Sequence, residues 1–528
     1  MKRVKLVYIR GAEIGTRKMQ SYPLGIMSMK YYAYSFDDIR SNVQIDIDIL
    51  SYDEFDEAYI YKIYNEDCEM VLFSSYIWNV SRTIEIARKI KIVCPQILIG
   101  LGGPEVDDAN TMLISNECID MIFVGEGEVS FTNAIRYFLF NENINLSGVV
   151  FKNKGKVFDT NMPKLLEDLD EIPSLVEDKL IAESEMLLYE TSRGCPFQCK
   201  YCCWAGKKMR YFSLARVERD LQALLTMENG SSVFIIDSEL DINIERAKKI
   251  MKIIIKYNIH QKIIQGFLGL HSIDEELLDL CRQAKFIFGI GIQSVNHETL
   301  EQCGRTWFDV KKFEEKLQIL KKYYDIRKIE FQLIMGLPGD NYETFRENLK
   351  WCEQMGAIHI TANRLYILPG SYFYKHAEKY KIQYDRQPYH LVYSNYSYSY
   401  NDIMRSEALL VAFHITKAIF NNHKNIVSRN GRLDIWEFIN ALTKIIEEKK
   451  LYSQGRQESQ TVEKSYQFEE MLIDNLKYIN CDYPEFRDFI HMEFARKMAK
   501  SFYLNDYAIE NKDIIKTLKI NPELFMVI

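Results

Sequence analysis

The sequence predicts an α/β protein with three parts: a doubly wound (Rossmann-like) parallel sheet, a partial (β/α)6 barrel and a helical C-terminal domain. Two blocks of alternating strand-like and helix-like stretches predict the first two parts. A segment of different composition separates the blocks, and long helical patterns follow them. We place the three parts at residues 1–140, 187–379 and 380–528, with a linker that contains a hairpin at 141–186.

The first block contains five short stretches rich in Ile and Val. Most are largely apolar, as a strand buried on both faces should be. One of them alternates with Asp, which is typical of an edge strand. The predicted strands are 4–9, 43–50 (the alternating one), 70–75, 97–102 and 119–124. Ligands of a doubly wound sheet bind beyond the carboxyl ends of its strands, so we expect a binding crevice there.

The remaining elements follow in order along the chain. Residues 148–160 predict a hairpin that turns at Lys154 and Gly155, and an acidic stretch after it completes the linker. Six further strands, each followed by a helical pattern, predict the partial barrel, whose active site is expected at the carboxyl ends. These strands are 187–190, 233–237, 263–267, 286–292, 328–334 and 359–366, and the clearest C-terminal helices are 406–420 and 433–446.

Composition limits the kinds of partner. The 528-residue chain has 74 acidic and 67 basic residues, a net charge of −7, so nucleic acid is not the expected partner. No run approaches the ~18 apolar residues of a membrane span, and the opening residues read as a strand and not as a secretory signal. Eleven cysteines, an odd number, argue against a disulfide framework. We expect a cytoplasmic protein.

The strongest chemical signal is a group of cysteines in the segment ETSRGCPFQCKYCCWAG. Cys195, Cys199 and Cys202 are spaced C-x3-C-x2-C directly after the first barrel strand. Three thiolates can bind a [4Fe–4S] cluster and leave one iron open to a small chelating ligand. A zinc site completed by Cys203, or a set of redox thiols, is the alternative. It is disfavoured because structural zinc normally uses a second, distant pair of cysteines.

This spacing, with Tyr201 before the last cysteine, resembles the signature of the radical S-adenosylmethionine (radical SAM) superfamily. The resemblance implies that the open iron chelates the amino and carboxylate groups of S-adenosylmethionine (SAM). One-electron reduction, by an external donor such as flavodoxin or ferredoxin, then cleaves the sulfonium. The products are methionine and a 5′-deoxyadenosyl radical that abstracts hydrogen from a substrate. Cys203 lies outside the pattern and is expected not to bind the cluster.

Polar or glycine residues follow several predicted barrel strands, where a barrel keeps its chemistry. By resemblance to the same superfamily, the candidates for SAM binding are Tyr201, Asp237, Glu239, Gln293, Ser294, Gln332 and Gly336. A structural alternative stands beside each: Asp237 or Ser294 could only cap a helix, and Gly336 could only form a turn.

Loops that follow the strands of the first block resemble the cobalamin (B12)-binding domain that precedes the barrel in one large radical SAM subfamily. The motifs are SYPLGI, FSSYIWN, GLGGPEVDD and VGEGEVSF. The resemblance implies cobalamin contacts from Tyr22, Pro23, Leu24, Gly25, Ser74, Ser75, Trp78, Gly102, Gly103, Pro104, Glu105, Gly125, Glu126 and Gly127. No histidine occurs before His260, so this domain has no histidine to offer as a lower cobalt ligand. A degenerate domain without its cofactor remains an alternative.

The resemblance implies a cobalamin-dependent radical SAM methyltransferase that methylates an unactivated carbon of a small-molecule or peptide substrate. One SAM would methylate cob(I)alamin, and a second would generate the 5′-deoxyadenosyl radical that activates the substrate for methyl transfer from methylcobalamin. Two alternatives stay open: a radical rearrangement, ring contraction or cyclisation without net methyl transfer, and a non-catalytic cobalamin or cluster carrier or sensor. The sequence assigns no catalytic acid or base.

Overall fold

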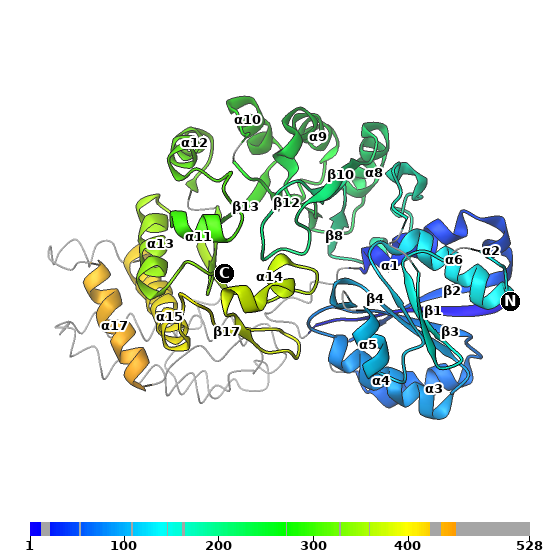
Figure 1. The fold of residues 1–528 in the computed structure, drawn as a ribbon. Helices are drawn as coiled ribbons and strands as arrows, with labels where there is room; N and C mark the ends of the chain where they lie inside the picture. Colours follow the sequence, from blue (N-terminus) through cyan, green and yellow to red (C-terminus); the bar gives the residue numbers. More distant parts are fainter. Residues whose placement is uncertain are drawn as a thin grey trace, which may run out of the picture. The chain divides into compact units, whose positions relative to one another are not determined.

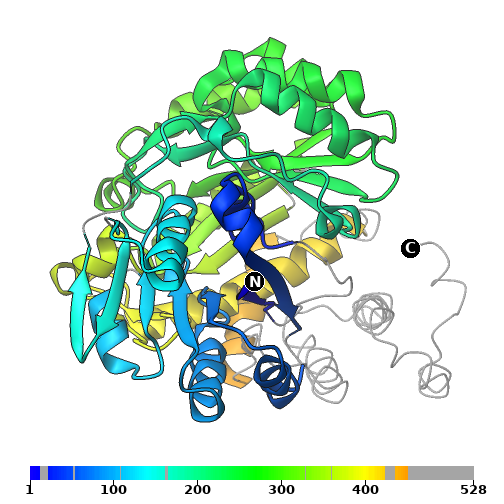
Figure 2. The ribbon, with the colours of Figure 1, turned by 90° about the vertical axis from the view of Figure 1, so that its right-hand side faces the viewer.

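The computed structural model describes ten segments of the chain: 1–11, 22–51, 54–106, 109–144, 146–160, 164–270, 272–326, 329–357, 359–422 and 435–449. The chain divides into two compact units. The first comprises Met1–Gly11, Met19–Asp340 and Asn348–Ser397, and the second comprises Ala12–Lys18, Asn341–Glu347 and Tyr398–Ile528. Both large sheets belong to the first unit (Figures 1 and 2).

The N-terminal sheet has seven strands in the order β2-β1-β3-β4-β5-β6-β7. The strands from β2 to β5 in this order are parallel, and β6 and β7 are antiparallel. Their bounds are β1 Lys2–Ile9, β2 Val43–Leu50, β3 Met70–Ser74, β4 Leu98–Gly102, β5 Met121–Phe123, β6 Val149–Asn153 and β7 Lys156–Asp159. The predicted edge strand is thus β2, which lies at one end of the sheet.

Helices cover both faces of this sheet, as the apolar strands require (Figure 1). One core contains buried side chains of α3 (Asp56–Asn65), α4 (Val80–Val93) and α5 (Ala109–Ser115). The other contains those of α1 (Leu24–Tyr34), α2 (Asp37–Asn42) and α6 (Gly127–Phe140). The result is the three-layer, doubly wound arrangement that the sequence predicts.

The hairpin of the predicted linker is part of the first sheet. Lys154 and Gly155 form its turn with φ angles of 49° and 76°. Strand β6 pairs with β5, so the hairpin extends the sheet by two strands and does not hang free between domains. Its first strand carries the alternating apolar side chains Val149 and Phe151, which are buried in the sheet's core.

The second sheet has six parallel strands in sequence order, as a partial barrel requires. They are β8 Met186–Tyr189, β11 Ser232–Ile235, β12 Ile263–Phe267, β13 Phe286–Gln293, β14 Glu330–Met335 and β15 His359–Arg364. The connecting helices lie outside the curved sheet (Figures 1 and 2). They are α8 Leu214–Thr226, α9 Ile244–Tyr257, α10 Glu275–Gln283, α11 His297–Gln302, α12 Val310–Tyr323 and α13 Tyr342–Gln354, with η3 Leu240–Asn243 before α9.

Short elements complete the first unit. An antiparallel hairpin, β9 (Ser192–Cys195) and β10 (Lys207–Tyr211), leaves the barrel after β8. Beyond β15 the chain forms α14, η5 and a small two-stranded sheet that the sequence does not predict, and the first domain and its linker contain further short helices. These elements are α14 Tyr372–Lys375, η5 Ala377–Tyr380, β16 Gln383–Tyr384, β17 Val392–Ser394, η1 Pro104–Val106, η2 Leu169–Glu171 and α7 Lys179–Ala182.

In the second unit, α15 (Tyr400–Asn422) and α17 (Ile435–Lys449) pack together. Arg405 Nε donates to Glu447 Oε1 over 3.2 Å, and the rings of Phe413 and Trp436 lie 5.8 Å apart. Helix α15 contains the predicted helix 406–420, and α17 overlaps the predicted helix 433–446. Residues 423–434 and 450–528 of the predicted helical domain lie outside the described part.

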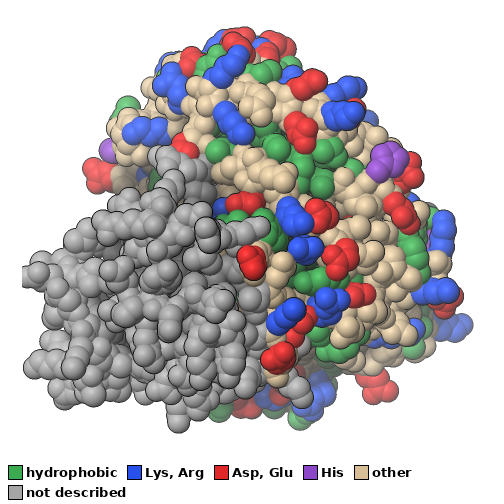
Figure 3. Space-filling model, turned by 90° about the vertical axis from the view of Figure 1, so that its left-hand side faces the viewer, with side chains coloured by type: hydrophobic (Ala, Val, Ile, Leu, Met, Phe, Trp, Pro, Cys, Tyr) green, Lys and Arg blue, Asp and Glu red, His purple; other side chains and the backbone are tan. Residues whose placement is uncertain are grey.

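Two properties of the described chain concern its surface. On the face drawn in Figure 3, basic and acidic side chains lie intermixed. Among the helices that the structure describes, none is both long and apolar enough to cross a membrane.

Candidate active site

The three cysteines lie on one hairpin at the carboxyl side of the barrel. Cys195 is the last residue of β9, and Cys199 and Cys202 lie in the loop that leads to β10. Gly194 has a φ of +105°, and a Cβ atom at this position would lie 2.2 Å from the Lys208 carbonyl oxygen. Only glycine therefore allows the two strands to approach this closely directly behind the first cysteine.

The loop is held from outside by the connection that follows α11. The Lys200 amide donates to the Cys303 carbonyl over 2.9 Å, and the ring of Phe197 stacks on Trp307 at 4.2 Å. Gly304 lies so close that a Cβ there would be 2.4 Å from the Gln198 carbonyl oxygen. These contacts fix the loop's backbone before any cofactor binds.

The donor set fits an iron–sulfur cluster. Cys199 is buried, and Cys195 and Cys202 are partly exposed. Burial, together with the charges of the neighbouring cysteines, raises the pKa of Cys202 to about 12, so a bound metal must supply the energy that deprotonates this thiol. Among the described residues no three side chains converge on a point that suits a single metal ion. A cube-shaped cluster does not need that convergence, because each cysteine binds a different iron.

A buried arginine that the sequence does not single out lies beside these cysteines. Arg305 is 4% exposed, and its guanidinium stacks on Trp307 with 4.5 Å to the ring centroid. Nη1 donates to Tyr201 Oη over 3.1 Å and lies 3.7 Å from Cys199 Sγ, while Nη2 donates to the Gly291 carbonyl over 2.7 Å. A lone arginine in a connecting loop carries no sequence motif, so only the fold shows that Arg305 lies beside the cluster cysteines.

The structure gives Asp237 and Ser294, both predicted SAM contacts, other partners. The carboxylate of Asp237 accepts hydrogen bonds from the Thr191 amide (2.7 Å), Thr191 Oγ1 (2.5 Å) and Ser192 Oγ (2.6 Å). Ser294 is fully buried, and its hydroxyl accepts from Asn348 Nδ2 (3.2 Å) and from the Asn296 amide (3.1 Å). We interpret both as residues that hold loops in place, a structural role that differs from the helix capping considered as the alternative.

Gly336, another predicted SAM contact, adopts a turn conformation. Its φ is +91°, and its carbonyl accepts a hydrogen bond from Asn395 Nδ2 over 2.8 Å. The conformation requires glycine irrespective of any ligand.

Three other predicted SAM residues lie in or directly after barrel strands: Glu239 precedes η3, Gln293 ends β13 and Gln332 lies in β14. Burial and the charge of Asp241 raise the pKa of Glu239 to about 8, with Arg305 acting in the opposite direction, so Glu239 and Arg305 share one environment. Gln293 has a φ of +68° at an irregularity between β13 and β14. A Cβ atom on Gly291 would lie 2.7 Å from Gln293 Nε2, so this glycine leaves room for the glutamine side chain.

Gln332 belongs to a polar group on adjacent barrel strands. Its Nε2 donates to Glu330 Oε2 over 3.3 Å, and Glu330 Oε1 accepts from Thr361 Oγ1 over 2.9 Å. Gly289 of β13 faces this group, since a Cβ atom there would lie 3.1 Å from Gln332 Nε2. Glycines at positions 289 and 291, on the same face of one strand, widen the inside of the barrel.

In the first domain, the order of the strands changes direction between β1 and β3, and the crevice at their carboxyl ends is the expected ligand site. Ser75 lies there with its Oγ fully buried and without a hydrogen-bond partner among the described residues. Trp78 is 38% exposed and stacks on Tyr76 at 4.5 Å. An unsatisfied buried hydroxyl and a flat, accessible ring fit a large planar cofactor with polar edges.

Two groups of residues that were predicted to contact cobalamin instead make contacts within the protein. Tyr22 Oη donates to the Leu188 carbonyl of the barrel over 2.5 Å, and Leu24 lines the same small cavity as Leu188. A Cβ atom on Gly103 would lie 2.5 Å from the Ser75 carbonyl oxygen, and one on Gly127 would lie 2.6 Å from Met29 Sδ. These glycines permit close packing of loops and helices.

Both predicted glutamates have partners later in the chain than the first sheet: His390 between β16 and β17, and Arg193 on β9. His390 Nε2 and Glu105 Oε1 lie 2.5 Å apart in a buried pair, and Arg193 Nη1 donates to Glu126 Oε2 over 3.0 Å. The structure thus gives Glu105 and Glu126 partners within the protein. The other predicted residues lie at the carboxyl edge of the sheet or at the start of α1: Pro23, Gly25, Ser74, Gly102, Pro104 and Gly125.

Comparison with known families finds two matches. Residues 189–352 match the model of the radical SAM superfamily, and residues 15–135 match that of the B12 binding domain. The matched ranges contain the cysteine loop with most of the barrel and most of the first sheet, respectively.

Several curated proteins are similar in sequence. The cobalamin-dependent radical SAM methyltransferase TokK of Streptomyces tokunonensis is 22% identical over 309 residues, covering 53% of this chain and 44% of that protein. The 2-(S-pantetheinyl)-carbapenam-3-carboxylate methyltransferase of Streptantibioticus cattleyicolor is 24% identical, covering 54% and 44%. The hopanoid C-3 methylase of Methylococcus capsulatus is 25% identical, covering 57% and 59%. The chain spans about half the length of these curated relatives.

Solved structures share the fold. The apo form of OxsB, a cobalamin-dependent S-adenosylmethionine radical enzyme, has a TM-score of 0.66 at 13% identity, covering 95% of this chain and 84% of that one. TsrM from Kitasatospora setae, a radical S-adenosylmethionine methyltransferase with cobalamin and a [4Fe–4S] cluster bound, has a TM-score of 0.58 at 14% identity, covering 70% and 74%. At these identities the likeness concerns the fold, and it confirms the predicted fold class.

Proposed function

Since this chain combines a B12-binding domain with a radical SAM domain and so belongs to the B12-binding radical SAM proteins, we propose that it is a cobalamin-dependent methyltransferase. Its reaction would be methylation of an unactivated carbon in a small-molecule or peptide substrate. The observation that carries this proposal is one compact unit that holds both the three-cysteine loop of the barrel and the crevice of the doubly wound sheet. The methyltransferases among the similar proteins support it.

We assign Cys195, Cys199 and Cys202 as the ligands of a [4Fe–4S] cluster. These cysteines would hold a cluster whose electron would cleave the C5′–S bond of bound SAM, giving methionine and a 5′-deoxyadenosyl radical able to abstract a hydrogen atom from the substrate. The protein's own part is to fix the conformation of the loop. Arg305 contacts Cys199 and Tyr201, and the stacked rings of Phe197 and Trp307 cover the same side of the loop.

We assign Glu239, Gln293 and Gln332 to polar contacts with SAM. They lie in or directly after barrel strands and have side chains that can bind hydroxyl, amino or carboxylate groups. Gly291 and Gly289 support this assignment, because the missing side chains leave space next to both glutamines. Tyr201 contributes its ring and not its hydroxyl, which Arg305 already binds.

We assign Ser75 and Trp78 to the cobalamin site at the carboxyl ends of β1 and β3, where cobalamin supplies the methyl group. Ser75 offers an unsatisfied hydroxyl for a polar edge of the corrin, and Trp78 offers a flat apolar surface. A protein with this chemistry needs an external electron donor such as flavodoxin or ferredoxin. We propose that it works in the cytoplasm, where such donors are available.

The test is made anaerobically on the full chain, reconstituted with iron, sulfide and hydroxocobalamin. Reductant and SAM with a deuterated methyl group are added. Mass spectrometry follows S-adenosylhomocysteine, 5′-deoxyadenosine and transfer of the label to the added cobalamin. We expect to detect both products and the labelled cobalamin. Alanine at Cys195, Cys199 and Cys202 should abolish 5′-deoxyadenosine, and the neighbouring variant Cys203→Ala should not.

Two outcomes would contradict the proposal. Formation of 5′-deoxyadenosine without transfer of the label would favour a radical rearrangement or cyclisation. Loss of the cluster in Cys203→Ala, with a cluster retained in Cys202→Ala, would show that the wrong third ligand is assigned.

A further inference from the structure

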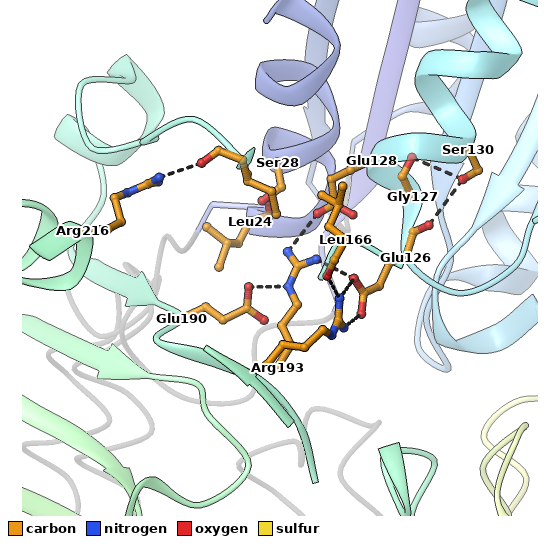
Figure 4. Close-up of polar contacts among 12 residues, drawn as sticks. Leu24, Ser28, Glu126, Gly127, Glu128, Ser130, Leu166, Glu190, Arg193 and Arg216 are labelled. Atoms are coloured by element: carbon orange, nitrogen blue, oxygen red, sulfur yellow. Dashed lines mark hydrogen bonds and ion pairs between the residues drawn. The ribbon is translucent and has the colours of Figure 1, made fainter. Parts of the chain in front are cut away.

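A group of buried and partly buried charges joins the two domains of the first unit (Figure 4). Arg193 and Arg210 come from the hairpin that carries the cysteine loop, on β9 and β10. Glu126 and Glu128 come from the start of α6 in the B12-binding domain, and Glu190 follows barrel strand β8. The side chains of Arg193, Glu126, Glu128 and Glu190 point toward one another in Figure 4, and Arg210 pairs with Glu126.

Arg193 is the centre of this group. Its Nη1 donates to Glu126 Oε2 (3.0 Å), its Nη2 to Glu128 Oε1 (2.9 Å) and its Nε to Glu190 Oε2 (2.9 Å). The side chains of Arg193 and Glu128 are only 9% and 5% exposed. All three nitrogens of one guanidinium therefore bind carboxylates, and two of these carboxylates belong to the other domain.

Arg210 extends the contact from the second strand of the hairpin. Its guanidinium pairs with both oxygens of Glu126, and Nη1 also donates to the Leu166 carbonyl over 2.7 Å. Although burial opposes ionisation of Glu126, the two arginines lower its pKa, so this glutamate is charged at neutral pH. Both of its oxygens are occupied by protein donors.

We propose that Arg193, with Arg210, Glu126 and Glu128, forms a positioning group that fixes the B12-binding domain against the hairpin that carries the cluster cysteines. Arg193 lies two residues before Cys195, so a shift of the domain relative to its guanidinium is a shift relative to the cluster loop. This inference rests on the proposed function only in what it says of the cofactors. It also replaces the predicted role of Glu126 as a cobalamin contact.

Charged side chains are well suited to fixing one domain against another. Buried ion pairs add little net stability compared with apolar packing, but a pair broken at one partner leaves a buried charge uncompensated. The planar fork of arginine also binds carboxylates in few orientations. An apolar interface tolerates sliding, whereas this arrangement is satisfied in a single placement. Methyl transfer between a cofactor in one domain and a radical in the other would require such a placement.

The hairpin is held from its other side as well. Ser192 Oγ, next to Arg193, donates to Asp237, and Ser238 Oγ donates to the Gly194 carbonyl over 2.8 Å. The strand before the first cysteine is therefore fixed to the barrel through Asp237 and Ser238, and to the B12-binding domain through Arg193.

The test compares the full-length variants Glu126→Gln, Glu128→Gln and Arg193→Lys with Glu167→Gln. Glu167 is the matched control, because it pairs with Lys208 of the same hairpin over 2.6 Å but both side chains are exposed (67% for Lys208 and 71% for Glu167). Hydrogen–deuterium exchange is measured on the protein without cofactors, and hydroxocobalamin affinity is measured separately. The exchange measurement needs no active enzyme, so its result is distinguishable from a failure of the proposed function.

We expect Glu128→Gln and Arg193→Lys to increase amide exchange at least fivefold both in 121–140 and in 192–211, and Glu167→Gln to change neither. Combining the two substitutions should add less than the sum of the single effects, since both remove the same contact. Glu126→Gln should keep its hydroxocobalamin dissociation constant within about threefold of the unsubstituted protein.

Two results would overturn the proposal. One is unchanged exchange in both segments in all three variants. The other is a more than tenfold loss of hydroxocobalamin affinity in Glu126→Gln with exchange at the level of the control, which would return Glu126 to the cobalamin site. If Arg193→Lys does not fold, Glu128→Gln decides the question, because it removes a charge while keeping the side chain's size.

Discussion

Replacing Arg305 by glutamine tests whether the buried cation tunes the cluster. Arg305 Nη1 lies 3.7 Å from Cys199 Sγ, and the guanidinium is almost completely buried. Hydrogen bonds to the sulfurs and nearby charges set the reduction potential of iron–sulfur clusters. A cation favours the reduced form, which carries one more negative charge, so its removal should make the potential more negative.

The size of the effect follows from the distance. Two unit charges about 4 Å apart interact by ~4 kcal/mol at an effective dielectric constant near 20. For a one-electron couple, 1.4 kcal/mol corresponds to ~59 mV, so ~170 mV is an upper limit. The added electron spreads over a cluster whose centre lies farther from Arg305 than Cys199 Sγ does. We therefore expect a shift of roughly 50–150 mV toward negative potential, scaled from the same interaction.

The assay is an anaerobic redox titration of the reconstituted cluster, followed by electron paramagnetic resonance. Arg305→Lys is the matched variant, because it keeps the charge but loses the planar fork, and it should shift the potential less than Arg305→Gln. An unchanged or more positive potential in Arg305→Gln, with an intact cluster, would refute the reasoning. A loss of cluster in both variants would instead assign Arg305 a role in holding the loop.

Three further predictions concern stability and cofactor binding. Gly194→Ala should cost at least about 1–3 kcal/mol of backbone strain and lower cluster content, measured by iron analysis, whereas Gly155→Ala, strained but without overlap, should keep the cluster. Asp237→Asn should lower the midpoint of thermal unfolding by weakening hydrogen bonds worth about 1.5–3 kcal/mol to a charged group; a tenfold loss of SAM affinity at unchanged stability would contradict this. Burial opposes protonation of His390, but Glu105 outweighs it and raises the pKa above 6.5. The stability that Glu105→Gln removes should thus be largest below pH 6.5 and shrink as pH rises through the raised pKa; equal losses at pH 6 and pH 9, in denaturant titrations, would contradict it.

Most of the fold was predictable from local patterns of apolar and polar residues in the sequence. Short, largely apolar stretches such as 4–9 and 70–75 became strands with nearly the same bounds, because a strand buried on both faces must be largely apolar along its length. The alternation in 43–50 identified the edge strand for the same reason. The hairpin at 148–160 was recognised by its turn, but its pairing with β5 was not, since pairing depends on which edge of the sheet is open.

The sequence by itself determined the spacing of the cysteines and the glycine behind them, because ligands a few residues apart on one loop are close in any fold. Only the tertiary structure decided which polar residues hold the protein together. Glu105 meets His390 across 285 residues, Cys199 meets Arg305 across 106, and Glu128 meets Arg193 across 65. A carboxylate after a strand looks the same in a sequence whether it binds a cofactor or an arginine of another domain. The difference lies in which buried partner the fold brings within hydrogen-bond distance.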